Sequence, residues 1–163
     1  MTGREDMERA REVGRLLIER GWRLATAESC TGGLIGHLIT EVSGSSAYYP
    51  GGVIAYANEV KEGMLGVSPA DLAAHGAVSA PVARTMARSI RDMMNTEIGL
   101  SVTGIAGPTG ATAGKPVGTV YIGLSSPLGE GVEHHIWPHN REINKLSSAR
   151  RALSMVIELL RTA

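Results

Sequence analysis

The sequence predicts an α/β fold, a three-layer α/β/α sandwich with a mixed, mainly parallel sheet. Amphipathic helices and short apolar strands alternate over the first hundred residues, as they do in chains that build parallel sheets. Two further strands follow late in the chain with only a tight turn between them, which indicates an antiparallel hairpin. Because no linker, internal repeat or low-complexity stretch interrupts this pattern, residues 1–163 are expected to form a single domain.

The first half of the chain is expected to run helix, strand, helix, strand, helix. Apolar residues recur at helical spacing from Met7 to Ile18 with charged residues between them, and Gly21 ends this helix. The next expected elements are a strand at 22–27, a helix at 34–42 ended by the turn cluster 43–46, a strand at 52–57, and a helix to about residue 65 with Asn58 as its N-cap.

The second half is expected to add three helices and three strands. Ser68 and Pro69 open a short helix, and Pro81 lies near the start of a longer amphipathic one. Asn140 begins a closing helix that carries one apolar stripe. The expected elements are helices at 69–75, 79–95 and from 140 onward, strands at 98–103, 117–125 and 131–137, and a glycine-rich loop at 104–114.

Length and composition argue against several classes of protein. A chain of 163 residues can bury roughly 70% of its unfolded surface, so a core forms without a metal or a disulfide. Lys plus Arg equals Asp plus Glu, 16 against 16, whereas duplex-DNA binders normally carry a basic excess. Aromatic residues make up 4% and Phe is absent, which leaves few side chains to stack on single-stranded nucleic acid. No nucleic-acid partner is expected.

No export or membrane segment is expected either. The first twenty residues are charged throughout and lack the apolar core of a signal peptide. No apolar run approaches the ~20 residues that a membrane helix needs. Cys30 is the single cysteine and cannot form an internal disulfide, which fits a reducing compartment. We therefore expect a cytoplasmic protein without a membrane partner.

Three segments that contain glycine or polar residues directly follow predicted strands, at residues 27–33, 56–61 and 103–110. In an open α/β sheet, ligands gather at the carboxyl ends of the strands. This shared position favours one composite site over three unrelated loops.

The first segment places Ser29 between a strand and a helix. A hydroxyl there is a candidate nucleophile, and the backbone N–H groups of Cys30, Thr31, Gly32 and Gly33 are candidates to stabilise an oxyanion. The simpler interpretation is that Ser29 or Thr31 caps the helix and that the two glycines permit a turn. Position alone favours the cap, because capping serines are common and nucleophilic serines are rare.

The second segment offers a base for that hydroxyl. The five histidines lie away from the strand-end loops, and no G-x-S-x-G elbow is present. Lys61 can take the proton if burial lowers its pKa so that the amine is neutral near pH 7, and Tyr56 could relay the proton or hold the lysine. The default interpretations are a solvated helix residue for Lys61, a half-buried strand residue for Tyr56 and a helix cap for Asn58.

The third segment, from Thr103 to Gly110, has backbone N–H groups that can cradle a phosphate or a sugar. It is neither a P-loop nor a G-x-G-x-x-G fingerprint, so a plain mobile loop is an equal alternative. Metal chemistry has little support, because His134 and His135 are adjacent in a strand and point to opposite faces. Cys30 is expected to be a buried, inert thiol, and Glu28 a carboxylate that holds its loop by hydrogen bonds.

Six motifs follow one another along the chain and carry a resemblance. They are AESCTGG at 27–33, GSS at 44–46, YANEVK at 56–61, HGAVS at 75–79, TGIAGP at 103–108 and KPVGTV at 115–120. Together they closely resemble the CinA C-terminal domain family, which includes the stand-alone nicotinamide-nucleotide amidases. The match extends from about Glu5 to the last helix.

The resemblance implies hydrolysis of nicotinamide mononucleotide to nicotinate mononucleotide and ammonia, by a homo-oligomer, commonly a dimer, that needs no metal or cofactor. It places the family's serine nucleophile on Ser29, its lysine on Lys61 and its tyrosine on Tyr56. The partner implied is a small-molecule nucleotide substrate. The further substrate-binding candidates are Asn58, Thr103, Gly104, Gly107, Arg141 and Lys145.

Two departures from the family pattern bear on these expectations. Many members begin the last helix with Gly-Asp-Arg and carry a second Arg one turn on, whereas this chain has His139-Asn140-Arg141 and Lys145. Arg141 keeps a phosphate-facing cation, while Lys145 keeps the charge but loses the bidentate fork of an arginine. The larger N-terminal domain of some members is not in this sequence, so no pyrophosphatase activity is expected.

Two alternatives to the amidase stay open. A non-catalytic pyridine-nucleotide-binding regulatory module would keep the glycine loops but would not need Ser29, Tyr56 and Lys61 together. A general serine esterase or amidase would share the nucleophile without requiring a phosphate-binding region.

Overall fold

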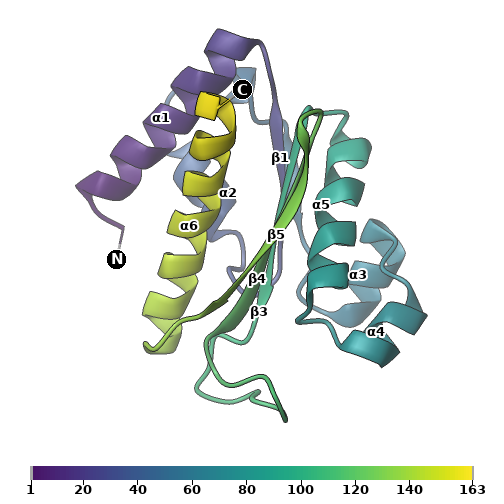
Figure 1. Cartoon of the computed structure of the whole chain (residues 1–163). Helices are drawn as coiled ribbons and strands as arrows, with labels where there is room; N and C mark the ends of the chain where they lie inside the picture. Colours follow the sequence, from purple (N-terminus) through teal and green to yellow (C-terminus); the bar gives the residue numbers. More distant parts are fainter. Residues whose placement is uncertain (1, 163) are drawn as a thin grey trace.

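A five-stranded sheet lies between two layers of helices (Figure 1). This arrangement confirms the predicted α/β fold, a three-layer α/β/α sandwich. The computed structural model describes residues 2–162. The strands lie in the order β2-β1-β3-β4-β5 and comprise β1 (Leu24–Glu28), β2 (Gly51–Ile54), β3 (Ile98–Gly104), β4 (Thr119–Ser126) and β5 (Gly129–Ile136).

The direction of each strand follows from its connection. β1 pairs in parallel with β2 and with β3, and helices connect these strands. β3 pairs antiparallel with β4, and β4 with β5, so the last two strands form the predicted hairpin. Within residues 2–162, four strands point one way and β4 is reversed, which gives the mixed, mainly parallel sheet that was predicted.

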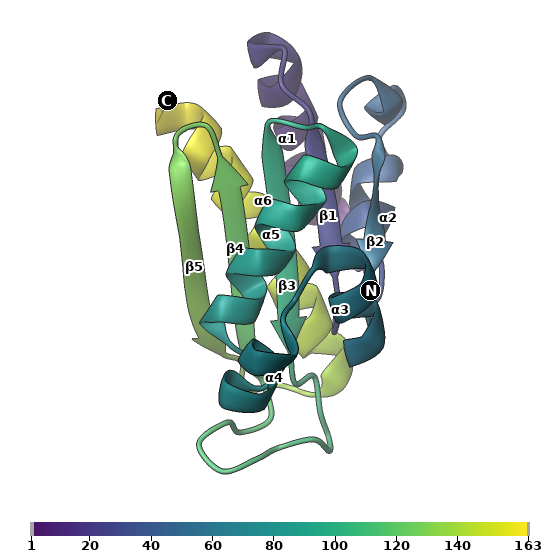
Figure 2. The same cartoon turned by 90° about the vertical axis from the view of Figure 1, so that its right-hand side faces the viewer.

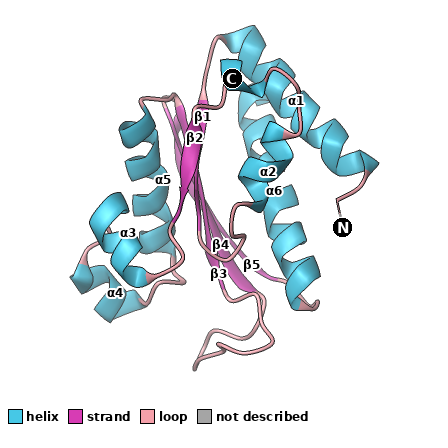
Figure 3. Ribbon diagram, turned by 180° about the vertical axis from the view of Figure 1, so that it is seen from behind, coloured by secondary structure: helices cyan, strands magenta, loops and turns pink. Residues whose placement is uncertain are grey.

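Both faces of the sheet are covered by helices (Figures 1 and 3). In the described part of the chain, no helix is both long and apolar enough to cross a membrane. One layer contains α1 (Arg4–Arg20), α2 (Leu34–Thr40) and α6 (Arg141–Thr162), and the other contains α3 (Asn58–Leu65), α4 (Pro69–His75) and α5 (Ala80–Met94), while a short 3-10 helix, η1 (Ser45–Ala47), leads from α2 toward β2.

Apolar side chains fill the space on each side of the sheet. All five residues of β1 are buried, as expected for a central strand that is covered on both faces. Successive side chains point to opposite faces, so Leu24 packs with α1, α2 and α6 while Ala25 packs with α3 and α5. The core thus fixes β1 and β3, two of the three strands whose carboxyl ends meet at the site.

Helix ends follow local capping chemistry. Gly21 ends α1 in the left-handed conformation, with a φ of 66°. The Asp71 N–H donates to the Ser68 Oγ at 3.0 Å, and this bond caps α4. The Ile143 N–H donates to the Asn140 Oδ1 at 3.0 Å, so Asn140 caps α6 where the sequence placed the start of that helix.

Two details of the predicted elements are wrong. Asn58 does not cap α3, because Ala57 occupies the N-cap position with extended backbone and Asn58 is already helical. Several strand boundaries also differ by up to three residues, as at β2, which ends at Ile54 rather than at residue 57. Pairing with a neighbouring strand decides where a strand ends, and the local sequence pattern does not contain that information.

Candidate active site

The carboxyl ends of β1, β2 and β3 meet at one end of the sheet, close to the long loop between β3 and β4 (Figure 2). A cavity of about 310 Å³ opens there, near the lower limit for small-ligand sites. The structure brings all three segments singled out in the sequence to this cavity. The predicted site residues that line this cavity are Ser29, Cys30, Tyr56, Asn58, Lys61, Thr103, Gly104, Gly107 and Arg141.

Ser29 directly follows β1, and the sheet fixes its backbone. Its N–H donates to the Val102 carbonyl of β3 at 2.9 Å. The residue is 7% exposed and lines the cavity, so its hydroxyl is accessible from that side. Gly33 is the N-cap residue of α2, so neither Ser29 nor Thr31 serves as the cap that the simpler interpretation assigned to them.

Lys61 lies one turn into α3 and turns its amine inward against Ser29. The residue is 2% exposed. Its Nζ lies 3.0 Å from the Ser29 Oγ, and it donates to the carbonyls of Ala55 at 2.9 Å and Tyr56 at 3.1 Å. The default interpretation of Lys61 as a solvated helix residue is therefore wrong.

The surroundings of Lys61 favour its neutral form. Burial lowers the pKa of the amine, because desolvation penalises the charged form. No carboxylate forms an ion pair with it within residues 2–162. A neutral amine has two N–H donors and one lone pair; if the carbonyls of Ala55 and Tyr56 take the two donors, the lone pair is left for the Ser29 hydroxyl.

Tyr56 contacts Lys61 through its backbone carbonyl and not through its phenol. The residue is 63% exposed, and its hydroxyl accepts a hydrogen bond from the Arg141 Nη2 at 3.3 Å. Because Lys61 and Ser29 are in direct contact, the geometry gives no support to a proton relay through the tyrosine.

Arg141, in the first turn of α6, connects two sides of the cavity. Besides its bond to Tyr56, it donates from Nη1 to the Gly107 carbonyl at 2.8 Å. Lys145, one turn further on, lies outside this cavity and lines a neighbouring hollow of about 490 Å³ together with Arg141 and Leu34. Its Nζ lies 3.7 Å from the position that a Cβ on Gly32 would occupy. Arg141 is thus placed directly at the cavity, and Lys145 beside it.

The loop after Ser29 offers fewer free N–H groups than its sequence suggests. The Gly32 N–H already donates to the Ser29 carbonyl at 3.0 Å. At the start of α2, the Leu34 N–H donates to the Thr31 carbonyl at 3.1 Å, and the N–H groups of Ile35 and Gly36 donate to the Glu28 carboxylate. Within residues 2–162 the N–H groups of Cys30, Thr31 and Gly33 donate to no carbonyl or carboxylate, and Cys30 is the one of these three residues that lines the cavity. We take Cys30 and Thr31, the two nearest to Ser29 in the chain, as the candidate oxyanion donors, and not the start of α2.

The glycine-rich segment lines the cavity, but packing also explains its composition. The Thr103 hydroxyl donates to the Ala77 carbonyl at 2.9 Å. A Cβ on Gly104 would lie 2.6 Å from a Val120 methyl group. Gly107 has a φ of +87°, and a Cβ there would lie 2.4 Å from Val117. These residues therefore shape the cavity wall through their backbone.

Cys30 is buried beside Ser29, and burial raises the pKa of its thiol to about 12. The thiolate, which is the reactive form, is therefore scarce near neutral pH. We expect iodoacetamide at pH 8 to alkylate Cys30 roughly 10³-fold more slowly in the native protein than in urea. At a fixed pH the thiolate fraction falls about tenfold for each unit by which the pKa rises. Intact-mass spectrometry over time gives both rates, and equal rates would contradict the inert thiol.

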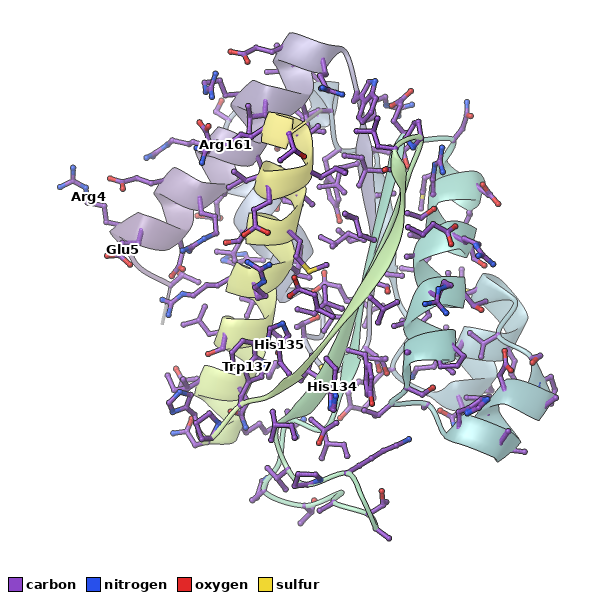
Figure 4. All side chains as sticks on the ribbon, in the orientation of Figure 1. Arg4, Glu5, His134, His135, Trp137 and Arg161 are labelled. Atoms are coloured by element: carbon purple, nitrogen blue, oxygen red, sulfur yellow. The ribbon has the colours of Figure 1, made fainter. Side chains whose placement is uncertain are left out.

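The two adjacent histidines of β5 lie on opposite faces of the strand, as predicted (Figure 4). His134 stacks on Tyr121 with ring centroids 4.5 Å apart, and His135 stacks on Trp137 at 4.6 Å. Residues 2–162 contain no group of three His, Cys, Asp or Glu side chains that could hold a metal ion. The histidines are members of two separate ring pairs and do not form a shared ligand pair.

Some parts of the site have no clear signature in the sequence. Ala77 and Val78 line the cavity from the segment between α4 and α5, and the sequence indicated them only as part of the HGAVS motif. The Ala55 carbonyl that receives Lys61 is a backbone group, so no residue type could have announced it.

Comparisons with known proteins agree on one family. Residues 6–160 match the model described as the CinA C-terminal domain. A CinA-like protein of Salinibacter ruber is 46% identical over 162 residues, which cover 95% of this chain and 39% of the relative. A CinA-like protein of Geobacter sulfurreducens is 50% identical over 151 residues, which cover 93% and 37%. The chain thus spans about two fifths of the length of these curated relatives.

Solved structures match over nearly their whole length. A CinA superfamily protein from Klebsiella pneumoniae gives a TM-score of 0.93 at 32% identity and covers 97% of this chain and 99% of its own. The competence/damage inducible protein CihA from Agrobacterium tumefaciens gives 0.91 at 38% identity, with 98% of each chain covered.

Proposed function

Because the chain belongs to the CinA C-terminal domain family, we propose that it hydrolyses nicotinamide mononucleotide to nicotinate mononucleotide and ammonia, with Ser29 as nucleophile and Lys61 as base. The observation that carries this proposal is the buried Lys61 Nζ at 3.0 Å from the Ser29 Oγ, beside a cavity. A module that only binds nucleotides has no need for this contact, and burying an amine costs free energy.

In the acylation step, neutral Lys61 accepts the Ser29 proton as the Oγ attacks the carboxamide carbon. The N–H groups of Cys30 and Thr31 donate to the oxyanion that forms. The Lys61 ammonium then gives its proton to the amide nitrogen, the C–N bond breaks and ammonia leaves. The product of this step is an acyl-serine that carries the nicotinate mononucleotide.

In the deacylation step, a water molecule attacks the acyl carbon and gives its proton to Lys61. The ester bond to the Ser29 Oγ breaks, and Lys61 returns the proton to that oxygen as nicotinate mononucleotide leaves. One lysine thus serves as base and acid in both halves of the reaction, so the phenol of Tyr56 is not needed as a relay.

The direct test is to incubate the purified protein with nicotinamide mononucleotide or free nicotinamide and to measure ammonia. We expect hydrolysis of the mononucleotide and much slower hydrolysis of nicotinamide. Binding of the mononucleotide by calorimetry without ammonia release would support the regulatory module instead. Comparable rates on both substrates would support a general serine amidase or esterase.

Arg141 is proposed to bind the phosphate because, of the two basic side chains that line the cavity, Lys61 is assigned as the neutral base. We expect Arg141→Ala to raise the KM for the mononucleotide by about 10–100-fold, the usual effect of losing a charge-assisted hydrogen bond. Arg141→Lys should recover part of this loss, since it keeps the charge without the fork. Initial-rate kinetics give the KM values. Arg88→Ala is the matched control, because Arg88 is an exposed arginine of α5 that pairs with Glu130; an Arg141→Ala enzyme with the wild-type KM would refute the assignment.

The family also implies a homo-oligomer, commonly a dimer. The oligomeric state stays a prediction, and light scattering on the purified protein tests it.

A further inference from the structure

The residue that directly precedes the proposed nucleophile in the chain carries a buried carboxylate. Glu28 is the last residue of β1 and is 2% exposed. A buried carboxylate normally pairs with a cation, yet Glu28 forms no ion pair within residues 2–162. The proposed reaction gives this group no chemical step. The role of Glu28 therefore lies in the groups that donate hydrogen bonds to its carboxylate.

The hydrogen bonds that the Glu28 carboxylate accepts all come from the segment that follows Ser29. Oε1 accepts from the Thr31 hydroxyl at 2.7 Å and from the Ile35 N–H at 2.9 Å, and Oε2 accepts from the Gly36 N–H at 3.0 Å. The N-cap residue of α2 is Gly33, which has no side chain to offer. Glu28 thus caps α2 from the end of β1.

Glu28 fixes the loop of residues 29–33 at both ends, through its backbone and through its side chain. At one end, Glu28 pairs with β2 and β3 in the sheet, and at the other its side chain fixes Thr31 and the start of α2. Between these ends lie Gly32 and Gly33, both with positive φ, where the backbone has the least intrinsic preference for one conformation. The same loop contains the Ser29 hydroxyl and the candidate oxyanion donors.

We propose that Glu28 is a positioning residue of the amidase site, which holds the Ser29 hydroxyl and the N–H groups of Cys30 and Thr31 in the geometry of the transition state. This inference rests on the proposed function. A negative charge beside a developing oxyanion would oppose catalysis, so the benefit of Glu28 lies in the three hydrogen bonds that its two oxygens accept. No glutamine can reproduce them, because one oxygen becomes an NH₂ group that faces a hydrogen-bond donor.

The experiment compares Glu28→Gln with the wild type in ammonia release from nicotinamide mononucleotide. We expect kcat to fall about 10²-fold, as when catalytic groups shift by about 1 Å, while KM stays within about twofold. Asp6→Asn is the matched control, because Asp6 is another buried carboxylate that caps a helix, α1, and accepts from the Gly3 N–H and from Arg150. It should lower the melting temperature but leave kcat as in the wild type.

A second pair of variants applies if Glu28→Gln does not fold. Thr31→Val removes only the hydroxyl that donates to Glu28, and Thr31→Ser restores a hydroxyl at the same place. We expect Thr31→Val to lower kcat about tenfold and Thr31→Ser to recover most of that loss, with little change in KM for either variant. A purely structural role would lower the melting temperature in these variants without the split between kcat and KM.

The outcomes separate this inference from the proposal on which it rests. A wild-type protein that releases no ammonia, and that forms no adduct at Ser29 with a fluorophosphonate, would refute the proposed function itself. An active wild type with an unchanged kcat in a folded Glu28→Gln variant would overturn only the positioning role. Loss of kcat to the same extent in Asp6→Asn would also overturn it, because the effect would then follow from stability.

Discussion

Ser29→Ala is expected to lower ammonia release from nicotinamide mononucleotide by about 10⁴–10⁶-fold, the range found when a nucleophile that acts together with a base is removed. The Ser29 Oγ is the atom that the Lys61 amine contacts at 3.0 Å, and alanine leaves that amine with nothing to deprotonate. Binding of the mononucleotide should persist, because the backbone and Arg141 are unchanged. Single-turnover assays give the rate, and calorimetry gives the affinity.

A matched control shows that such a loss is specific to the site. Ser101→Ala also removes a buried hydroxyl, one that donates to the Ala83 carbonyl from the middle of β3. It should lower the melting temperature more than Ser29→Ala and retain activity. Ser29→Ala with near-wild-type kcat would remove Ser29 as nucleophile.

Lys61→Met is the second variant with a large expected effect. Methionine fills a similar volume without an amine, so we expect kcat to fall about 10³–10⁴-fold through loss of the general base. Because Ser29 and Lys61 act as a unit, the double variant Ser29→Ala/Lys61→Met should be no slower than Ser29→Ala alone within about threefold. Additive losses in the double variant would show that the two residues act separately. Lys115→Met, which removes a lysine that contacts the His75 carbonyl at the surface, is the control.

The pH dependence of activity should follow from the same amine. Only the neutral form of Lys61 can accept a proton, so kcat/KM should fall as the pH drops through its pKa. Burial holds that pKa below its usual 10.5, so this limb should lie below pH 10.5. Rates measured across the pH range check this expectation, and a kcat/KM that is independent of pH would contradict it.

The stability of the wild type relative to Lys61→Met should also depend on pH. Between the lowered native pKa and 10.5, the unfolded chain binds a proton at Lys61 that the folded chain does not bind. The free energy of unfolding of the wild type therefore rises with pH through this window, relative to the variant. Cys30 interacts electrostatically with Lys61, so the difference is read below pH 9, where the Cys30 thiol is largely protonated in both proteins. Urea denaturation of both proteins at several pH values measures it, and a constant difference would show that burial does not shift Lys61.

Much of the fold could be predicted from the sequence because its signals are local. α4 was placed at its observed bounds, since Ser68, Pro69 and Asp71 act within one helical turn. The hairpin and the start of α6 were likewise indicated by a turn and by Asn140. The ends of β2 and the first residue of α3 were not, because strand pairing determines them.

The candidate site divides in the same way. Its motifs indicated Ser29 and Lys61, and the family resemblance indicated Arg141. No local pattern indicates that the phenol of Tyr56 turns toward Arg141, 85 positions away, rather than toward Lys61. No local pattern indicates either that the Glu28 carboxylate accepts hydrogen bonds from the N–H groups at the start of α2.

The sequence by itself determined the order of the elements, the family and the residues that carry reactive groups. Only the tertiary structure decided that an amine and a hydroxyl 32 positions apart touch, and that the amine is buried beside two carbonyls. The physical reason is that hydrogen bonds within a turn depend on neighbours in the chain. Desolvation, which lowers the pKa of Lys61, instead depends on every segment that packs around it.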